Sequence, residues 1–191
     1  MKTLVMDTAS KYLFFSFIEN GQVLYEVMDE GKNNHSDNLL KKIELALIET
    51  NLSLKDFKRI VVGIGPGSYT GLRVSVTVAK MLAWTLGIDL YIVSSLSILS
   101  SGHFDNDGIY AVTIRAKKNH VYGKLVEVNG GIQKILINDM FSSDEVFFDM
   151  IKNYNYKLVN EENYKIKYEN MLLEKVDNLH QLNPNYIQRG I

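Results

Sequence analysis

Apolar residues in the first half of the chain form short runs separated by turn signals, together with two longer segments of helical periodicity. The short runs predict strands at residues 3–6, 14–19, 23–28, 59–62 and 90–93. The periodic segments predict helices over residues 37–50 and 70–86, with Thr70 as the cap of the second helix and Gly87 as its stop. This order of elements is typical of an α/β fold with a ribonuclease H-like sheet.

The pattern changes near residue 102, where we place the boundary between two lobes, residues 1–101 and 102–191. Beyond it, a helix capped by Ser142 is predicted to reach residue 153. Apolar runs predict strands on either side of this helix, at residues 109–114, 121–128, 132–137 and 156–160. The second lobe is therefore predicted to be a reduced, degenerate version of the first. The polar sequence that follows predicts no clear element.

A glycine-rich turn joins the fourth predicted strand to the second helix, with the sequence Gly63-Ile64-Gly65-Pro66-Gly67-Ser68-Tyr69-Thr70-Gly71-Leu72-Arg73. A strand, a glycine turn and a helix N-terminus together form a natural anion site. The turn is not a Walker loop, because Leu72 and Arg73 follow its last glycine. Gly67 and Gly71 are expected to serve backbone geometry, Gly67 through a positive φ. Two interpretations stay open: a sharp corner without a ligand, or a phosphate-facing turn formed by Gly65, Gly67, Ser68, Thr70 and Gly71.

The two predicted helices carry more apolar residues than one sheet can cover. On the second helix, apolar residues extend almost all the way round, and only Arg73, Thr77 and Lys80 form a polar strip. On the first helix, apolar residues also occur opposite the core face, among charged neighbours. Either the first helix covers the second, or the uncovered residues form a protein interface. We favour an interface, with the candidate residues Leu45, Ile48, Arg73, Met81 and Trp84.

Composition and charge narrow the function classes. The chain has 191 residues, no Cys and a net charge of −1, so it lacks Cys-based sites and the basic field of a dedicated nucleic-acid binder. Its one dense basic cluster, Arg115, Lys117, Lys118 and His120, is predicted to be a solvated hairpin turn. The four His are isolated from one another, so no metal site is expected. Without a signal peptide or a membrane-length apolar run, we expect a cytoplasmic protein that does not engage a membrane.

Several segments resemble one family, the TsaB (YeaZ) proteins. They are the opening Leu4-Val5-Met6-Asp7-Thr8-Ala9, the segment His35-Ser36-Asp37-Asn38-Leu39-Leu40, the glycine-rich turn with Ala79-Lys80, and the ending Asn183-Pro184-Asn185-Tyr186-Ile187-Gln188-Arg189. The resemblance is strong over residues 1–101 and patchy beyond them. It implies an actin/Hsp70-like fold of two lobes.

The resemblance also implies a function without catalysis. TsaB proteins are non-catalytic partners of TsaD, a paralogue that transfers threonylcarbamoyl to the adenosine next to the anticodon, giving N6-threonylcarbamoyladenosine (t6A). They contact TsaD through the helices of the first lobe, and TsaE, an ATPase, joins the complex. For this chain the resemblance implies a TsaD-like partner, a TsaE-like ATPase reached through the complex and indirect contact with tRNA. Two states stay open for the isolated chain, a homodimer and a monomer. It implies no cofactor in the isolated chain, with nucleotide bound only in the complex, and no support for an older glycoprotease label.

Departures from the related sequences bear on enzymatic alternatives. TsaD proteins carry two metal-binding His where this chain has Ser95 and Leu99, and a Leu cannot replace an imidazole ligand. Many TsaB members carry two carboxylates where this chain has Arg115 and His120. Asp7 stands where actin-like ATPases carry an acidic residue, but the phosphate turn that follows it there is missing, so Asp7 could instead bond the turn backbone. The alternatives are a self-sufficient actin-like ATPase, a TsaD-type metal-dependent transferase, and an interaction module unrelated to tRNA, against which the glycine motif argues.

Overall fold

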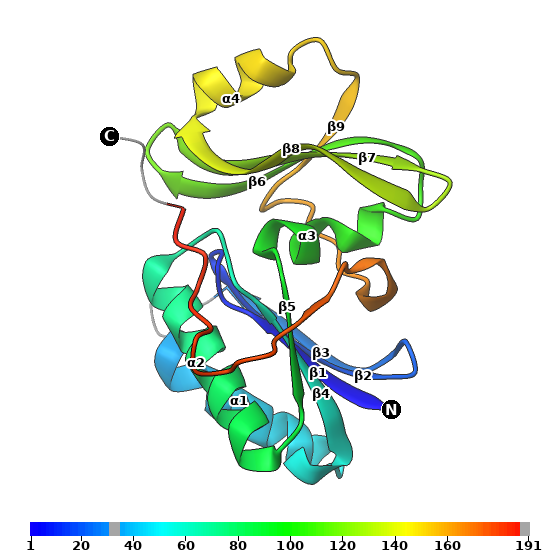
Figure 1. Ribbon diagram of the computed structural model, residues 1–191, viewed down its shortest axis with the longest axis vertical. Helices are drawn as coiled ribbons and strands as arrows, with labels where there is room; N and C mark the ends of the chain where they lie inside the picture. Colours follow the sequence, from blue (N-terminus) through cyan, green and yellow to red (C-terminus); the bar gives the residue numbers. More distant parts are fainter. Residues whose placement is uncertain (31–34, 188–191) are drawn as a thin grey trace.

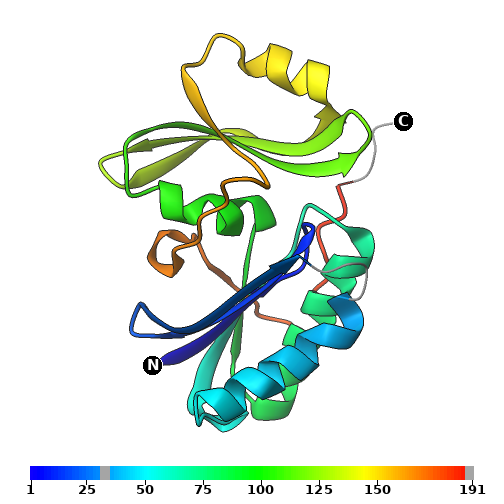
Figure 2. The ribbon, with the colours of Figure 1, turned by 180° about the vertical axis from the view of Figure 1, so that it is seen from behind.

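The computed structural model describes residues 1–30 and 35–187, which form two β-sheets stacked with a helix between them (Figure 1). Helices α1 (His35–Glu49) and α2 (Tyr69–Leu86) cover the outer face of the first sheet. Helix α3 (Ser95–Ser100) lies between the two sheets, and α4 (Asp144–Ile151) covers the outer face of the second. Figure 2 shows α1 and α2 side by side on the same face.

The first sheet has the strand order β10-β5-β4-β1-β2-β3. The strands are Lys2–Asp7 (β1), Tyr12–Glu19 (β2), Gln22–Glu30 (β3), Phe57–Gly63 (β4), Asp89–Val93 (β5) and Glu174–Lys175 (β10). β2 is antiparallel to β1 and β3, whereas β4 is parallel to both β1 and β5. This is the predicted ribonuclease H-like arrangement, and the strands and helices predicted for the first lobe are confirmed. Gly87, at φ 64°, ends α2 as predicted.

The central strands of this sheet are buried on both faces, which explains their unbroken apolar runs. Leu4 and Met6 of β1 and Val62 of β4 pack beneath α1 and α2. Their neighbours Val5 and Val61 belong to the core on the opposite face, which α3 helps to form. Because side chains alternate along a strand, one apolar sequence supplies both cores.

The second sheet repeats the start of the first. Its strands are Gly108–Lys117 (β6), His120–Asn129 (β7), Ile132–Ser143 (β8) and Tyr156–Val159 (β9), in the order β8-β7-β6-β9. β6, β7 and β8 form an antiparallel meander, α4 follows, and β9 lies parallel to β6. The elements β1, β2, β3, α1 and β4 have the same arrangement. The second lobe is therefore a reduced version of the first, as predicted.

Two details of the second lobe differ from the prediction. β8 continues to Ser143 instead of ending at residue 137, because its second half pairs with the start of β7. Ser142 lies in that pairing, opposite Val121, and does not cap α4. The cap is Ser143, whose Oγ accepts a hydrogen bond of 3.3 Å from Val146 N. α4 then ends at Ile151, before the predicted residue 153.

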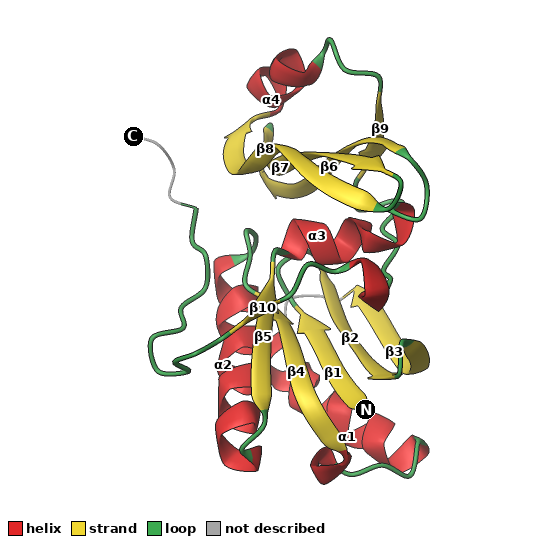
Figure 3. Cartoon of the chain, turned by 45° about the vertical axis from the view of Figure 1, so that its right-hand side comes forward, coloured by secondary structure: helices red, strands yellow, loops and turns green. Residues whose placement is uncertain are grey.

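After β9 the chain crosses back to the first lobe, a return that the sequence pattern did not predict (Figure 3). β10 pairs antiparallel with β5 at the edge of the first sheet. The chain then runs beside α2, and Leu179 and Leu182 pack against the core beneath the helices. Part of the range 102–191 therefore completes the first sheet and flanks its second helix.

Candidate functional site

The glycine-rich turn is a tight corner whose cap differs from the predicted one. β4 ends at Gly63 and α2 begins at Tyr69. Ser68 is the N-cap of α2, because its Oγ accepts a hydrogen bond of 3.2 Å from Gly71 N. Thr70, the predicted cap, lies within the first helical turn and is exposed. The prediction was wrong because Ser68 and Thr70 both carry a capping hydroxyl, and their spacing alone does not select one.

Three amides of the turn are hydrogen-bonded within the chain. Ser68 N donates to Ala9 O over 2.6 Å, and Gly65 N donates to Ser95 Oγ over 3.0 Å. The Gly71 amide is bonded to the cap. Amides that point into such a turn are the groups that would bind an anion. These three amides already have oxygen acceptors, and a phosphate-facing role of the turn stays a prediction.

Gly67 and Gly71 are required because the turn leaves no room for a Cβ at either position. The glycine of this turn with a positive φ is Gly65, at 106°, so the expected positive φ at Gly67 was wrong. A Cβ on Gly67 would overlap the backbone carbonyl of Ala9, and a Cβ on Gly71 would overlap that of Thr8. Both glycines therefore permit the close approach of this turn to the β1–β2 loop.

Asp7, at the end of β1, is a carboxylate sealed inside the first lobe. It is 1% exposed. Ala9 N donates to its Oδ1 over 2.9 Å, and Ser95 Oγ donates to its Oδ2. Burial raises the pKa of Asp7 to about 6, although the hydrogen bonds from Ser95 and Ala9 act to lower it. Gly63 of β4 lies against this carboxylate, so Asp7 links β1, β4 and α3.

The raised pKa predicts that Asp7 makes stability depend on pH. A carboxyl whose pKa is raised on folding stabilises the folded chain below the unfolded pKa of 3.8 and loses this contribution as pH rises through about 6. About two pKa units correspond to about 3 kcal/mol. We expect the difference in unfolding free energy between wild type and Asp7→Asn to fall by about 3 kcal/mol between about pH 3 and pH 8, measured by urea denaturation. A difference that stays constant over this range would contradict the assignment.

The two positions that match the metal-binding His of TsaD are buried. Ser95 and Leu99 lie on α3, and each is 0% exposed. Ser95 donates a hydrogen bond to Asp7 and accepts one from Gly65. Leu99 packs in the core between α3 and the second sheet. In this chain both positions serve hydrogen bonding and packing of the interior.

Helix α2 has an apolar stripe that the described part of the chain leaves uncovered. α1 packs beside Val78 and Leu82, which are buried, so the first helix does cover part of the second. On the adjacent face of α2, however, Met81 is 45% exposed and Trp84 is 70% exposed. On α1, Ile48 is 71% exposed. The first helix therefore covers one face of α2, and a partner interface on the exposed face stays a prediction.

The exposed residues of α1 divide between its two sides. Tyr25 of β3 donates a hydrogen bond to Glu49, so one side of α1 faces β3. Each residue advances 100° around the helix axis, so Leu45, which is 49% exposed, lies near Glu49 on the side toward β3. Leu40, which is 44% exposed, lies on the side toward α2. Sequence reasoning missed Leu40, because a periodic pattern does not separate the rim of a core face from the core itself.

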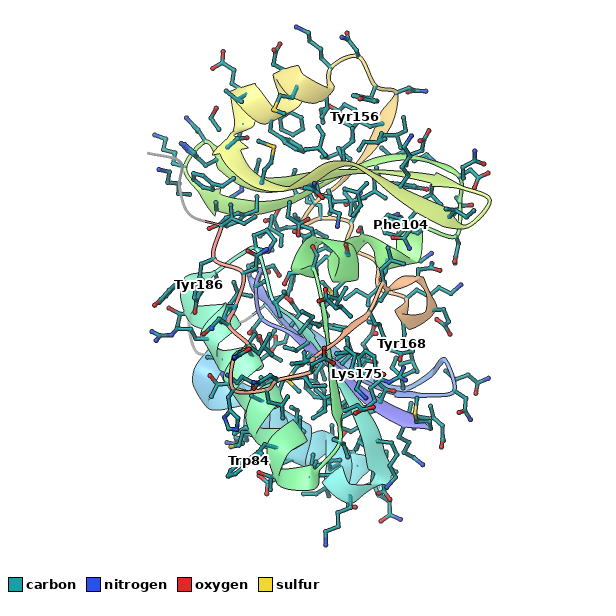
Figure 4. The ribbon with its side chains drawn as sticks, viewed as in Figure 1. Trp84, Phe104, Tyr156, Tyr168, Lys175 and Tyr186 are labelled. Carbon is teal, nitrogen blue, oxygen red and sulfur yellow. The ribbon has the colours of Figure 1, made fainter. Side chains whose placement is uncertain are left out.

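The C-terminal segment borders the exposed stripe of α2. Lys80 Nζ donates to Leu182 O over 2.8 Å, so this residue of the predicted polar strip holds the segment against α2. A shallow hollow between helix and segment is lined by Met81 and Trp84 on one side and by Leu179 on the other. Trp84 lies on the outer side of α2 in Figure 4. The candidate surface is therefore composite, with contributions from two distant parts of the sequence.

A stack of two rings and one cation lies at the N-terminal end of α2. The ring centroids of Tyr69 and Tyr186 are 4.8 Å apart, and the Arg73 guanidinium lies 5.0 Å from the Tyr69 ring. Tyr69 is 56% exposed. This contact positions the candidate interface residue Arg73. Sequence reasoning missed both tyrosines as site residues, because nothing local to Tyr186 indicates that it returns to α2.

Comparison with known proteins identifies the family. A family model described as TsaD, tRNA N6-adenosine threonylcarbamoyltransferase, matches residues 23–179. The chain is also 32% identical over 152 residues to the tRNA threonylcarbamoyladenosine biosynthesis protein TsaB of Bacillus subtilis. It belongs to the TsaB (YeaZ) family of TsaD-related proteins. The match to the Bacillus protein covers 80% of the chain and 66% of that relative, so the activity and partners of the whole relative are proposals for this chain.

Solved structures show the same fold. YeaZ from Pseudomonas aeruginosa has a TM-score of 0.67 and 24% sequence identity, covering 74% of the chain and 67% of YeaZ. An uncharacterized protein described as similar to the peptidase YeaZ from Pseudomonas aeruginosa has a TM-score of 0.75 and 18% identity, covering 98% of the chain and 99% of that protein. The actin/Hsp70-like fold expected from the sequence is confirmed. Over residues 1–30 and 35–187, no helix has the length and apolar character needed to cross a bilayer.

Proposed function

We propose that this chain is a non-catalytic subunit of the t6A synthesis machinery, and that it binds and supports a TsaD-type transferase. The TsaB relative in Bacillus subtilis supports the assignment to t6A biosynthesis. The observation that carries the binding role is a set of exposed apolar side chains on the two helices, Met81 and Trp84 on α2 and Ile48 on α1. Large apolar side chains gain free energy when a partner removes them from water. A partner that covers both helices would supply this gain.

The burial of Asp7 supports a role without catalysis. A general acid or base must come within hydrogen-bond reach of the reacting group. Asp7 is instead enclosed by β1, β4 and α3 and is bonded to Ser95 and Ala9. Ser95 and Leu99 offer no imidazole at the positions where TsaD binds metal. These features favour a binding subunit over an actin-like ATPase or a TsaD-type transferase.

The remaining partners follow from the same proposal. A TsaE-like ATPase would join through the complex, nucleotide would be bound in the complex, and the transferase would present the tRNA. When the partner is absent, a second copy of the chain could cover the same stripe and form a homodimer. The proposed place of action is the cytoplasm.

Reconstitution from purified components tests the proposal. The chain, its TsaD-type partner, a TsaE-like ATPase, threonylcarbamoyl-adenylate and unmodified tRNA are combined, and each protein is omitted in turn. We expect t6A, measured by mass spectrometry of the tRNA nucleosides, when the chain and the transferase are both present. We expect none from the chain in the absence of the transferase.

A further inference from the structure

The turn between β6 and β7 holds the basic cluster in a fixed hairpin (Figure 1). Asn119 has a φ of 58°, and its carbonyl accepts a hydrogen bond of 3.1 Å from Asp144 N at the start of α4. His120 Nδ1 lies 3.0 Å from Lys118 O. The predicted hairpin is thus confirmed, and contacts on both of its sides determine where its side chains project.

The cations of this turn are not neutralised by partners. Arg115, Lys117 and Lys118 are exposed, and none of them forms an ion pair with another described residue. Other lysines of the chain do form such pairs, for example Lys11 with Glu30. In a chain whose net charge is −1, three unpaired cations within four positions make a local positive field.

Aromatic rings lie directly beside these cations. The His120 and Phe141 rings are stacked, with centroids 5.2 Å apart and an interplanar angle of 16°. Lys117 Nζ lies 5.7 Å from the centre of the Phe141 ring. The centroids of the Tyr122 and Phe141 rings are 5.4 Å apart. Phe141 comes from the far end of β8, so this arrangement is invisible in the sequence around the turn.

We propose that this cluster, formed by Lys117, Lys118, His120 and Phe141, binds a single-stranded segment of RNA. Single-stranded nucleic acid is bound by cations that follow its phosphates and by rings that stack on its bases. The cluster combines both groups at one place, where the β6–β7 turn adjoins the end of β8. An acidic protein segment would use the cations but gain nothing from the stacked rings. The inference goes beyond the proposed function, which assigns RNA to the transferase, and rests on that function only where it identifies the RNA as tRNA.

Carboxylates near the turn limit the site to one side of the hairpin. Glu161 Oε1 accepts a hydrogen bond of 2.6 Å from Arg115 N, and Glu161 and Glu162 share with Arg115 the lining of a neighbouring hollow. Asp144 lies beneath the turn at the start of α4. The phosphates are therefore expected at Lys117 and Lys118, next to Phe141.

The test measures RNA binding by the full chain with labelled RNA, using fluorescence anisotropy at salt concentrations from about 50 to 200 mM. The two probes are an unmodified tRNA and a short oligouridine. Lys117→Glu/Lys118→Glu should weaken binding at least about tenfold. It should also reduce the slope of log K against log salt concentration by about 0.7 for each lost phosphate contact. Phe141→Leu should weaken binding about fivefold, the loss of one modest base stack, and leave the salt dependence unchanged.

A matched control is Lys55→Glu/Lys58→Glu, which makes the same charge change on two exposed residues, Lys55 just before β4 and Lys58 near its start. It should bind RNA within about twofold of wild type, because its lysines lie outside the cluster. Equal losses in the two double variants, or no binding of either RNA by wild type, would overturn the proposal. So would a variant at 117 and 118 that binds RNA normally but no longer binds the transferase, since the cluster would then be a protein contact. Failure here leaves the reconstitution result untouched, because the proposed function assigns the tRNA to the transferase.

Discussion

Met81→Glu and Ile48→Glu are each expected to abolish stable binding of a TsaD-type partner while leaving the chain folded. Met81 is 45% exposed and Ile48 is 71% exposed, so a carboxylate is solvated at either position in the free chain. In the complex the same carboxylate would be buried without a partner, which is strongly unfavourable. Residues at the centre of an interface contribute about 2 kcal/mol or more, so affinity should fall at least about 30-fold. Isothermal titration calorimetry measures the loss, and circular dichroism checks the fold.

Ile132→Glu is the matched control for these variants. Ile132 is 75% exposed and lies on β8 of the second lobe, away from both helices. It should bind the partner like wild type, because only the position of the new charge differs. If Met81→Glu and Ile48→Glu also bind normally, the interface lies elsewhere. If both unfold, these residues belong to the core and the helices carry no partner surface.

Gly67→Val is expected to cause a large loss of stability. Its Cβ would overlap the Ala9 carbonyl, which is backbone and cannot move aside without displacing the β1–β2 loop. The same shift would break the hydrogen bond of 2.6 Å from Ser68 N to Ala9 O. Overpacking of this kind costs about 3 kcal/mol, or a fall of about 6–12 °C in Tm. Differential scanning calorimetry measures the change.

Thr70→Val provides the comparison for that experiment. Thr70 is exposed, lies in the same turn of the chain and does not cap α2. The free energy of unfolding of the Thr70→Val variant should differ from that of wild type by less than about 0.5 kcal/mol. If Gly67→Val has an unchanged Tm but loses partner binding, the glycine serves contact and our steric account of the turn is wrong.

Local signals were sufficient to predict the first lobe. Asn20-Gly21 between alternating runs predicts the β2–β3 hairpin, and Asn20 indeed has a positive φ of 50°. Gly87 likewise predicts the end of α2 from its own conformational freedom. These elements are determined by residues adjacent in sequence, so a single chain contains enough information to place them.

The C-terminal return could not be predicted, because nonlocal contacts stabilise it. β10 contains two residues, Glu174 and Lys175, and exists through its pairing with β5. Leu179 and Leu182 are isolated apolar residues in a polar segment, and their partners lie beneath α2. No periodicity arises from such single contacts, and the composite nature of the α2 surface therefore remained hidden.

The candidate site was predicted in part. Ile48, Met81 and Trp84 are exposed on the helices, as helical periodicity indicated. The basic turn was predicted as a solvated hairpin, but its ring partner Phe141 comes from the end of β8 and could not be placed beside it. The face of a helix on which a residue lies can be predicted from sequence spacing. A contact between residues on different strands can be placed only when the pairing of the strands in the sheet is known.

The reconstitution with omitted components tests most directly the claim that this chain supports catalysis without performing it. We predict t6A with the complete set, none when the transferase is omitted, and a strong loss when Met81→Glu replaces the wild-type chain. Synthesis of t6A by the chain without the transferase would contradict a non-catalytic role. Equal synthesis with and without the chain would contradict its role as a required subunit.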